Sequence, residues 1–177
     1  HVDAVYVTTW TSEHARLVEK AVTRGKAVFC EKPLAVNAKI AEQMVAAVEK
    51  VGVPNQVGLV LRFLAPFRFV RHLLADPRAG RVLSVVFRDD QYIPIQGQYG
   101  SDWRGDPLRA GRGALLEHSI HDLDILVWLL GPVRSLSGQL REVHGLPRID
   151  DVAVAQLEFT SGALASLSSI WHDVLER

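Results

Sequence analysis

Short apolar runs alternate with helix-periodic stretches through the first sixty residues. Residues 3–9 form a run rich in apolar and β-branched side chains, typical of a strand buried on both faces of a parallel sheet. The runs at 26–30 and 55–63 have the same character. Between them, apolar positions recur every three or four residues and predict helices over 11–25 and 37–52. This order predicts parallel strands joined by right-handed helical crossovers.

After residue 60 the pattern changes. Apolar positions predict helices over 67–75 and 113–131, with a strand at 81–90 and a long polar loop at 91–112 between them. Three further runs read as antiparallel strands, at 133–143, 151–160 and 163–171. Ser161-Gly162 is typical of the tight turn between the last two.

These patterns predict an α/β part followed by an α+β part. We expect residues 1–60 to be the C-terminal half of a Rossmann-type parallel sheet. Residues 61–177 are expected to form an α+β domain with a mainly antiparallel sheet. The chain opens directly on a strand and closes just after one. We therefore expect an internal fragment that lacks both ends.

Composition and charge narrow the class of protein. Apolar residues make up 48% of the chain, and Lys plus Arg equals Asp plus Glu at 20 each. A neutral balance without a basic stripe argues against nucleic acid and membrane surfaces as partners. The longest strongly apolar run, 125–130, is too short to span a bilayer. A single cysteine, Cys30, excludes an internal disulfide and fits a reducing cytoplasm.

An acid, a base and a proline follow the second predicted strand, as Glu31, Lys32 and Pro33. In open parallel α/β sheets, ligands bind outside the carboxyl ends of the strands, which is where this triplet falls. Pro33 restricts the backbone of Lys32 and so aims its side chain. A fixed ammonium can hold a substrate hydroxyl or polarise a carbonyl. The alternative is a polar turn with Lys32 in solvent.

Ionisable residues also interrupt the predicted helix 113–131. Glu117 and His121 are four residues apart and share a helical face, with His118 and Asp124 three residues to either side of His121. Polar groups on a largely apolar helix need partners or water-lined space. A hydrogen-bonded structural histidine is one possibility, and a zinc-type site is another. No second ligand cluster is evident in the sequence, so we expect no metal.

Several short motifs occur along the chain in a fixed order. They are TTWTSEH at 8–14, CEKPL at 30–34, Arg62-Phe63 followed by Pro66, Trp103-Arg104, and GRGALLEHSIHDLD at 111–124. In these motifs the chain resembles the Gfo/Idh/MocA family, the glucose–fructose oxidoreductase, inositol dehydrogenase and rhizopine-catabolism group. The resemblance covers essentially the whole chain. It implies hydride transfer between NAD or NADP and a CH–OH group of a sugar, cyclitol or related polyol.

The resemblance also implies roles for single residues. Lys32 would touch both substrate and nicotinamide, and His121 would handle the proton. Glu117 stands where the family has Asp, so it would orient His121 or bind a substrate hydroxyl. The residues expected near the cofactor are Thr9, Trp10, His14, Glu31 and Lys32.

The expected substrate residues are drawn from both parts of the chain. They are Lys32, Arg62, Trp103, Arg104, Glu117, His118 and His121. For Arg62 and Arg104 the alternative is a surface ion pair, and for Trp103 a core aromatic position.

One family feature is missing from the chain. No G-x-G-x-x-G turn occurs, and we expect it to precede His1, so the resemblance implies that this chain alone is inactive. The resemblance also implies that residues 61–177 bind substrate and join subunits into a homo-oligomer, a dimer or tetramer. Two other functions stay open. One is a metal-dependent hydrolase or lyase that uses Glu117, His118 and His121, and the other is a non-catalytic relative that acts as a binding module.

Overall fold

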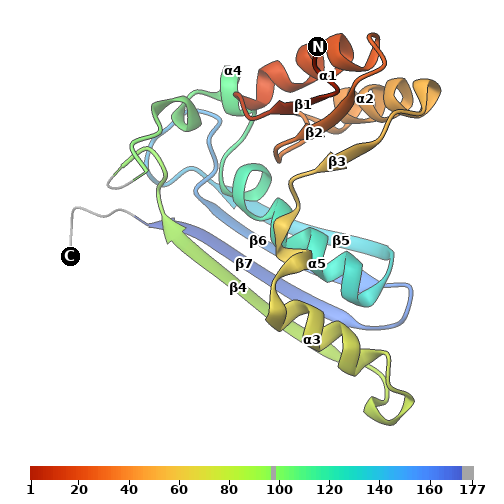
Figure 1. The fold of residues 1–177 in the computed structure, drawn as a ribbon. Helices are drawn as coiled ribbons and strands as arrows, with labels where there is room; N and C mark the ends of the chain where they lie inside the picture. Colours follow the sequence, from red (N-terminus) through yellow and green to blue (C-terminus); the bar gives the residue numbers. More distant parts are fainter. Residues whose placement is uncertain (97–98, 173–177) are drawn as a thin grey trace.

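The computed structural model describes residues 1–96 and 99–172. Residues 97–98 of the predicted loop and residues 173–177 at the end of the predicted second domain lie outside the described residues. The elements gather around two sheets, joined by the segment that follows β3 (Figure 1). Within the described residues, no helix has the length and apolar character needed to cross a membrane.

The first sheet is parallel, as predicted. Its strands lie in chain order, namely β1 (Ala4–Val7), β2 (Ala27–Cys30) and β3 (Asn55–Val57). Helices α1 (His14–Val22) and α2 (Ala38–Val51) cover one face (Figure 1). The Asn37 side chain accepts a hydrogen bond from the Ile40 amide and begins α2, and Gly52 ends it in the left-handed conformation. The two crossovers place the carboxyl ends of all three strands at one edge.

The third strand is shorter than predicted. The pattern predicted strand to residue 63, but pairing with β2 ends at Gly58, whose amide donates to the Cys30 carbonyl. The neighbouring strand, β2, ends at Cys30, and the chain that follows it turns away by Pro33, where the Lys32–Pro33 peptide bond is cis. With no strand left to pair with, residues Val60–Phe63 form a 3-10 turn that leads into α3 (Ala65–Leu74).

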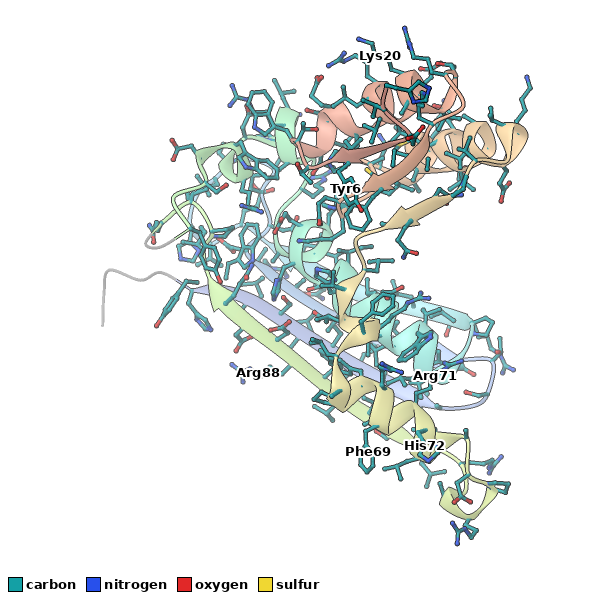
Figure 2. The ribbon with its side chains drawn as sticks, in the orientation of Figure 1. Tyr6, Lys20, Phe69, Arg71, His72 and Arg88 are labelled. Carbon is teal, nitrogen blue, oxygen red and sulfur yellow. The ribbon has the colours of Figure 1, made fainter. Side chains whose placement is uncertain are left out.

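The second sheet has four strands in the order β4-β7-β6-β5. They are β4 (Ser84–Tyr92), β5 (Val133–Arg141), β6 (Val152–Phe159) and β7 (Leu164–His172). The predicted antiparallel pairing of the last three is confirmed, whereas β4 runs parallel to β7. Helix α5 (Ile120–Leu130) packs Leu126 and Leu130 against one face of this sheet. Arg88 points away from the helices on the opposite, uncovered face (Figure 2).

The predicted loop and the helix after it are more structured than the pattern indicates. The loop contains a 3-10 turn (Asp102–Gly105) and α4 (Pro107–Ala110); another 3-10 turn, Pro77–Ala79, precedes β4. The single helix predicted over 113–131 is in fact a π-helical turn, Ala114–His118, followed by α5.

Asp150 anchors the start of the π-helical turn. Its carboxylate accepts hydrogen bonds from the amides of Gly113 and Leu115, at 3.1 and 2.9 Å. Its carbonyl accepts from the Ala114 amide at 2.6 Å. These bonds satisfy the first amides of the segment, which have no acceptor within the turn itself, so Asp150 fixes the place at which the π-helical turn starts.

Candidate active site

A cleft of about 620 Å³ lies at the carboxyl ends of β1 and β2. The residues that line it come from the ends of both strands and from the 3-10 turn at 102–105: Thr8, Thr9, Trp10, Glu13, Glu31, Lys32, Trp103 and Arg104. Helix α4 contacts both the turn at 102–105 and residues Thr11–Glu13, which places the turn beside the carboxyl ends of the strands. Six of these residues therefore sit where ligands bind in open parallel sheets, as the sequence predicted for Thr9, Trp10, Glu31 and Lys32.

His14 does not line the cleft, although it was predicted to lie near the cofactor. Its side chain is 1% exposed. Nδ1 lies 2.9 Å from the Pro33 carbonyl oxygen and Nε2 lies 3.1 Å from the Thr9 carbonyl oxygen. Both ring nitrogens are thus engaged with the backbone. His14 joins the ends of β1 and β2 beneath the cleft and fixes the backbone on which Trp10 and Lys32 stand.

Glu117 is the meeting point of two cations. The Lys32 Nζ donates to the main-chain oxygen of Glu117 at 2.6 Å and to its Oε1 at 3.2 Å. The Arg104 Nε donates to the same Oε1 at 2.9 Å. Glu117 is 3% exposed, so the carboxylate is held away from water between two positive groups. Burial strengthens such charge-assisted hydrogen bonds and makes the loss of either partner costly.

His121 lies next to this triad. It is half-buried, and its Nδ1 has no hydrogen-bond partner among the described residues. Burial lowers the pKa of His121 below its usual 6.5, and the positive charges of Lys32 and His118 lower it further, against the opposing effect of Glu117 and Asp124. A neutral imidazole at pH 7 can accept a proton.

Arg62 lies outside the cleft lining. Its guanidinium makes a bidentate pair with Asp124, with Nε 2.7 Å from Oδ2. The Asp124 side chain is 9% exposed, and that of Arg62 is 40% exposed. This is the ion pair that the sequence left open as the alternative for Arg62. The pair anchors the turn at 60–63 to α5, close to His121.

The two tryptophans of the cleft each carry an arginine on one ring face. The guanidinium carbon of Arg109 lies 4.1 Å from the Trp10 ring centroid, and that of Arg104 lies 4.6 Å from the centroid of Trp103. Cation–π contacts of this kind fix the position and orientation of the ring. Trp103 is therefore part of the cleft wall and not of the core.

His118, Asp89 and Asp122 form a second group of titratable side chains, of which the sequence singled out only His118. The His118 Nε2 lies 3.0 Å from Asp89 Oδ2, so His118 is directed toward β4. Asp122 is completely buried beside them. The spacing of His118 and Asp122, four residues apart, was the available signal.

Glu117, His118 and His121 do not converge as a ligand set. The Glu117 carboxylate is bound to Lys32 and Arg104, and His118 is bound to Asp89. Among residues 1–96 and 99–172, no group of three or more metal-ligating side chains has a suitable arrangement. The geometry gives no support to the metal-dependent hydrolase or lyase.

Known proteins resemble this chain over its whole length. A 1,5-anhydro-D-fructose reductase of Ensifer adhaerens is 33% identical over 97% of this chain and 50% of its own. The structure of an aldose–aldose oxidoreductase from Caulobacter crescentus, complexed with glycerol, matches with a TM-score of 0.85 at 34% identity, over 97% and 51% of the two chains. The WlbA dehydrogenase from Bordetella pertussis, in complex with NADH and UDP-GlcNAcA, matches with a TM-score of 0.89 at 25% identity, over 100% and 51%.

This chain thus spans about half the length of the curated relatives that it matches. Two family profiles match it in succession. Residues 1–59 match the oxidoreductase family with an NAD-binding Rossmann fold, and residues 67–176 match the GFO/IDH/MocA C-terminal domain. Together with the parallel sheet and the four-stranded sheet, these matches show that the chain belongs to the GFO/IDH/MocA family of oxidoreductases.

Proposed function

We propose that the protein is an NAD(P)-dependent oxidoreductase acting on a CH–OH group of a sugar, cyclitol or related polyol. One observation carries the proposal. The ammonium of Lys32 stands at the carboxyl end of β2, in the cleft, bound to Glu117 and beside the half-buried His121. This arrangement combines a fixed positive charge with a proton acceptor of lowered pKa, the two groups that oxidation of an alcohol requires.

The residues of the cleft fit the nicotinamide end of such a cofactor. The cleft opens at the carboxyl ends of two parallel strands, the usual position for a nucleotide in this type of sheet. We assign contact with nicotinamide and its ribose to Thr9, Trp10, Glu31 and Lys32, all of which line the cleft. His14 takes the part of a positioning residue beneath them. The chain has no G-x-G-x-x-G turn, so none of its residues is assigned to the pyrophosphate.

Nicotinamide, when bound, accepts the hydride from the substrate carbon. His121 takes the proton of the substrate hydroxyl, because its lowered pKa keeps the imidazole neutral near pH 7. The Lys32 ammonium has three N–H donors. Two of them donate to oxygens of Glu117, which leaves one for the substrate oxygen. Its charge stabilises the negative charge that develops there. In the reductive direction His121 returns the proton.

Trp103 and Arg104 are assigned to substrate binding from the cleft wall. Trp103 offers a flat ring to the face of a sugar, and Arg104 fixes both Trp103 and Glu117. The carboxylates of Glu13, Glu31 and Glu117 outnumber the positive charges of Lys32 and Arg104 in and beside the cleft, which favours a neutral polyol over an anionic substrate. The similarity to enzymes named for 1,5-anhydro-D-fructose and for aldoses supports this choice.

The arrangement of the protein is proposed in the same way. Residues 1–60 and 61–177 would act as a nucleotide-binding and a substrate-binding domain. The uncovered face of the four-stranded sheet bears exposed apolar side chains, among them Val86, Val154 and Leu164, and would join subunits into a dimer or tetramer. A cytoplasmic location fits the single buried Cys30.

Turnover of the intact protein tests the function. Purified protein is incubated with NAD or NADP and a panel of aldoses and cyclitols, and reduced nicotinamide is followed by absorbance. Lys32→Met should lower kcat by about two orders of magnitude or more, because the positive charge that stabilises the reacting substrate oxygen is lost. Lys20→Met is the matched control, since Lys20 is exposed on α1 (Figure 2) and should leave kcat unchanged.

Two results would contradict the proposal. One is equal turnover by Lys32→Met and Lys20→Met. The other is intact protein that binds NAD or NADP yet reduces neither with any of the neutral polyols, which would favour the non-catalytic binding module.

A further inference from the structure

A series of hydrogen bonds leads from Asp150 to the Lys32 ammonium. The Asp150 carboxylate accepts from the Gly113 amide at 3.1 Å, and the Gly113 carbonyl accepts from the Glu117 amide at 2.8 Å. The main-chain oxygen of Glu117 then accepts from Lys32 Nζ at 2.6 Å. Between Asp150 and Lys32 this path runs only through backbone atoms, so it does not depend on the Glu117 carboxylate.

The Asp150 end of the path is fixed to the second sheet. Asp150 is 3% exposed and follows Ile149, which is completely buried in one cluster with Ala114 and Trp171. The Trp171 amide on β7 donates to the carbonyl of the next residue, Asp151, at 2.8 Å. Asp150 therefore stands on a rigid support.

The contact between Asp150 and the π-helical turn is equally rigid. Besides Gly113, the Leu115 amide donates to the carboxylate at 2.9 Å and the Ala114 amide donates to the Asp150 carbonyl at 2.6 Å. The two backbones approach so closely that a Cβ at residue 113 would lie 1.8 Å from the Asp150 carbonyl oxygen. Contact between backbone atoms leaves no side-chain torsion to absorb a shift. The place of the turn thus follows from that of Asp150.

The turn carries this placement to Lys32. The Ser119 amide donates to the Ala114 carbonyl at 2.9 Å, a bond that spans five residues and marks the wide turn, a feature often found at functional sites. Within this turn the main-chain oxygen of Glu117 faces Lys32. An ammonium bound to a main-chain oxygen keeps its position as long as the backbone keeps its own.

We propose that Asp150 is a positioning residue of the active site, which sets the place of the Lys32 ammonium through the backbone of residues 113–117. Reacting groups must be held within about 0.5 Å of their productive geometry, and a misplacement of about 1 Å costs about 100-fold in rate. The part of Asp150 in turnover rests on the proposed function, but its hold on Lys32 does not.

Asp150→Asn is the smallest change that tests this hold. It keeps the shape of the side chain but replaces one acceptor oxygen by an NH₂ group, so one of the two amide bonds is lost. Asp151→Asn is the matched control. Asp151 is 1% exposed, and its carboxylate accepts from the amides of Val143 and His144 at 2.8 and 2.5 Å, in the connection between β5 and β6.

Chemical modification measures the hold on Lys32 without any turnover. The intact protein is treated briefly with acetic anhydride, and mass spectrometry gives the acetylation rate of Lys32 relative to that of the exposed Lys20. In the wild type this ratio should be low, because the Lys32 side chain is 16% exposed and its ammonium is held by two acceptors. We expect the ratio to rise several-fold in Asp150→Asn and to stay at the wild-type value in Asp151→Asn.

Two results overturn the proposal. One is a ratio that is the same in Asp150→Asn and the wild type. The other is a rise as large in Asp151→Asn, which would reflect loss of stability alone.

Amide hydrogen exchange in the wild-type protein tests the same path if Asp150→Asn does not fold. The Gly113 and Leu115 amides should be protected as strongly as the Trp171 amide on β7, because all three are held to the same support. Exchange of Gly113 that is orders of magnitude faster than that of Trp171 also overturns the proposal.

Turnover tests the consequence for the reaction. In Asp150→Asn, kcat should fall about tenfold or more, and by a larger factor than KM rises, because a misplaced Lys32 acts mainly on the reacting oxygen. An unchanged kcat beside a raised acetylation ratio would overturn the part of Asp150 in turnover. If the wild type itself shows no turnover, the proposed function fails, while the acetylation ratio still decides whether Asp150 holds Lys32.

Discussion

Lys32 and Glu117 are 85 residues apart in sequence, and the Lys32 ammonium lies 2.6 Å from the Glu117 main-chain oxygen and 3.2 Å from its Oε1. The contact joins the carboxyl end of β2 to the π-helical turn that precedes α5, the helix packed on the four-stranded sheet. Because Lys32 binds both the side chain and the backbone of Glu117, it fixes the turn as well as the carboxylate. Arg104 closes the arrangement from a third segment.

Glu117→Gln should destabilise the protein. The amide keeps the shape of the side chain but leaves Lys32 and Arg104, with side chains 16% and 27% exposed, without their counter-charge. Loss of one partner from a buried charge cluster costs about 2–4 kcal/mol of unfolding free energy. Urea denaturation measures it. Glu42→Gln, exposed on α2, is the control and should stay within about 0.5 kcal/mol of wild type. Equal midpoints for both variants would show that the cluster adds nothing to stability.

Gly113→Ala should prevent the π-helical turn from forming. A Cβ at residue 113 would lie 1.8 Å from the Asp150 carbonyl oxygen, and no flexible side chain can yield there. We expect little folded protein, measured by near-UV circular dichroism and soluble yield. Gly25→Ala separates this clash from backbone strain. Gly25 has a φ of 65° with nothing within 4 Å of the added carbon, so its cost should be only about 1–2 kcal/mol. Gly113→Ala that is as stable as Gly25→Ala would refute the close approach.

The contribution of Asp122 to the stability of the wild-type protein should fall as the pH rises from about 4 to about 7. Burial raises the folded-state pKa of Asp122 from its ordinary 3.8 to about 7, so in this window the folded protein binds more protons than the unfolded chain. Each pH step upward therefore favours unfolding, by about 2–4 kcal/mol in total, and the loss ends above pH 7. The difference in Tm between Asp122→Asn and wild type should grow across the window. A constant difference would show that Asp122 titrates normally.

Cys30 should be inert in the folded protein. It is 2% exposed, and burial, with a smaller effect of the Glu31 charge, raises its pKa to about 12. The thiolate is the reactive form, so at pH 8 a thiol reagent should label Cys30 only as fast as the protein opens. Labelling in urea supplies the rate of the free thiol. Similar rates with and without urea would place Cys30 at an accessible position.

Local pattern was sufficient for much of the fold. The parallel unit, the capped helix from Asn37 to Gly52 and the antiparallel order of the last three strands each follow from periodicity and turn residues close in sequence. Lys32 was predicted as a site residue because the triplet follows a strand's carboxyl end, where ligands bind in open parallel sheets. His121 and Glu117 were predicted from their spacing on one helix and from the family resemblance, and these roles stay predictions.

Features set by distant contacts could not be predicted in this way. The start of the π-helical turn is anchored by Asp150, 35 or more residues further along the chain, and nothing near residue 114 marks it. Asp122 was not singled out in the sequence, and only the structure shows that it is fully buried. The early end of β3 depends on β2 turning away at Pro33. His14 has a suitable side chain for a ligand contact, and only its depth beneath the cleft shows otherwise.

Asp150 and Asp151 are adjacent in sequence, and each binds a different segment of the chain. Asp150 holds residues 113–115, while Asp151 accepts hydrogen bonds from the amides of Val143 and His144. Through Asp150 and Asp151, hydrogen bonds therefore tie the connection between β5 and β6 to the start of the π-helical turn that carries Glu117. In directed evolution, insertions or grafts at 142–148, most of which are exposed, should therefore shift Glu117 through Asp150 and residues 113–115. Under the proposed function, this connection would let turnover be tuned from a place remote from Lys32.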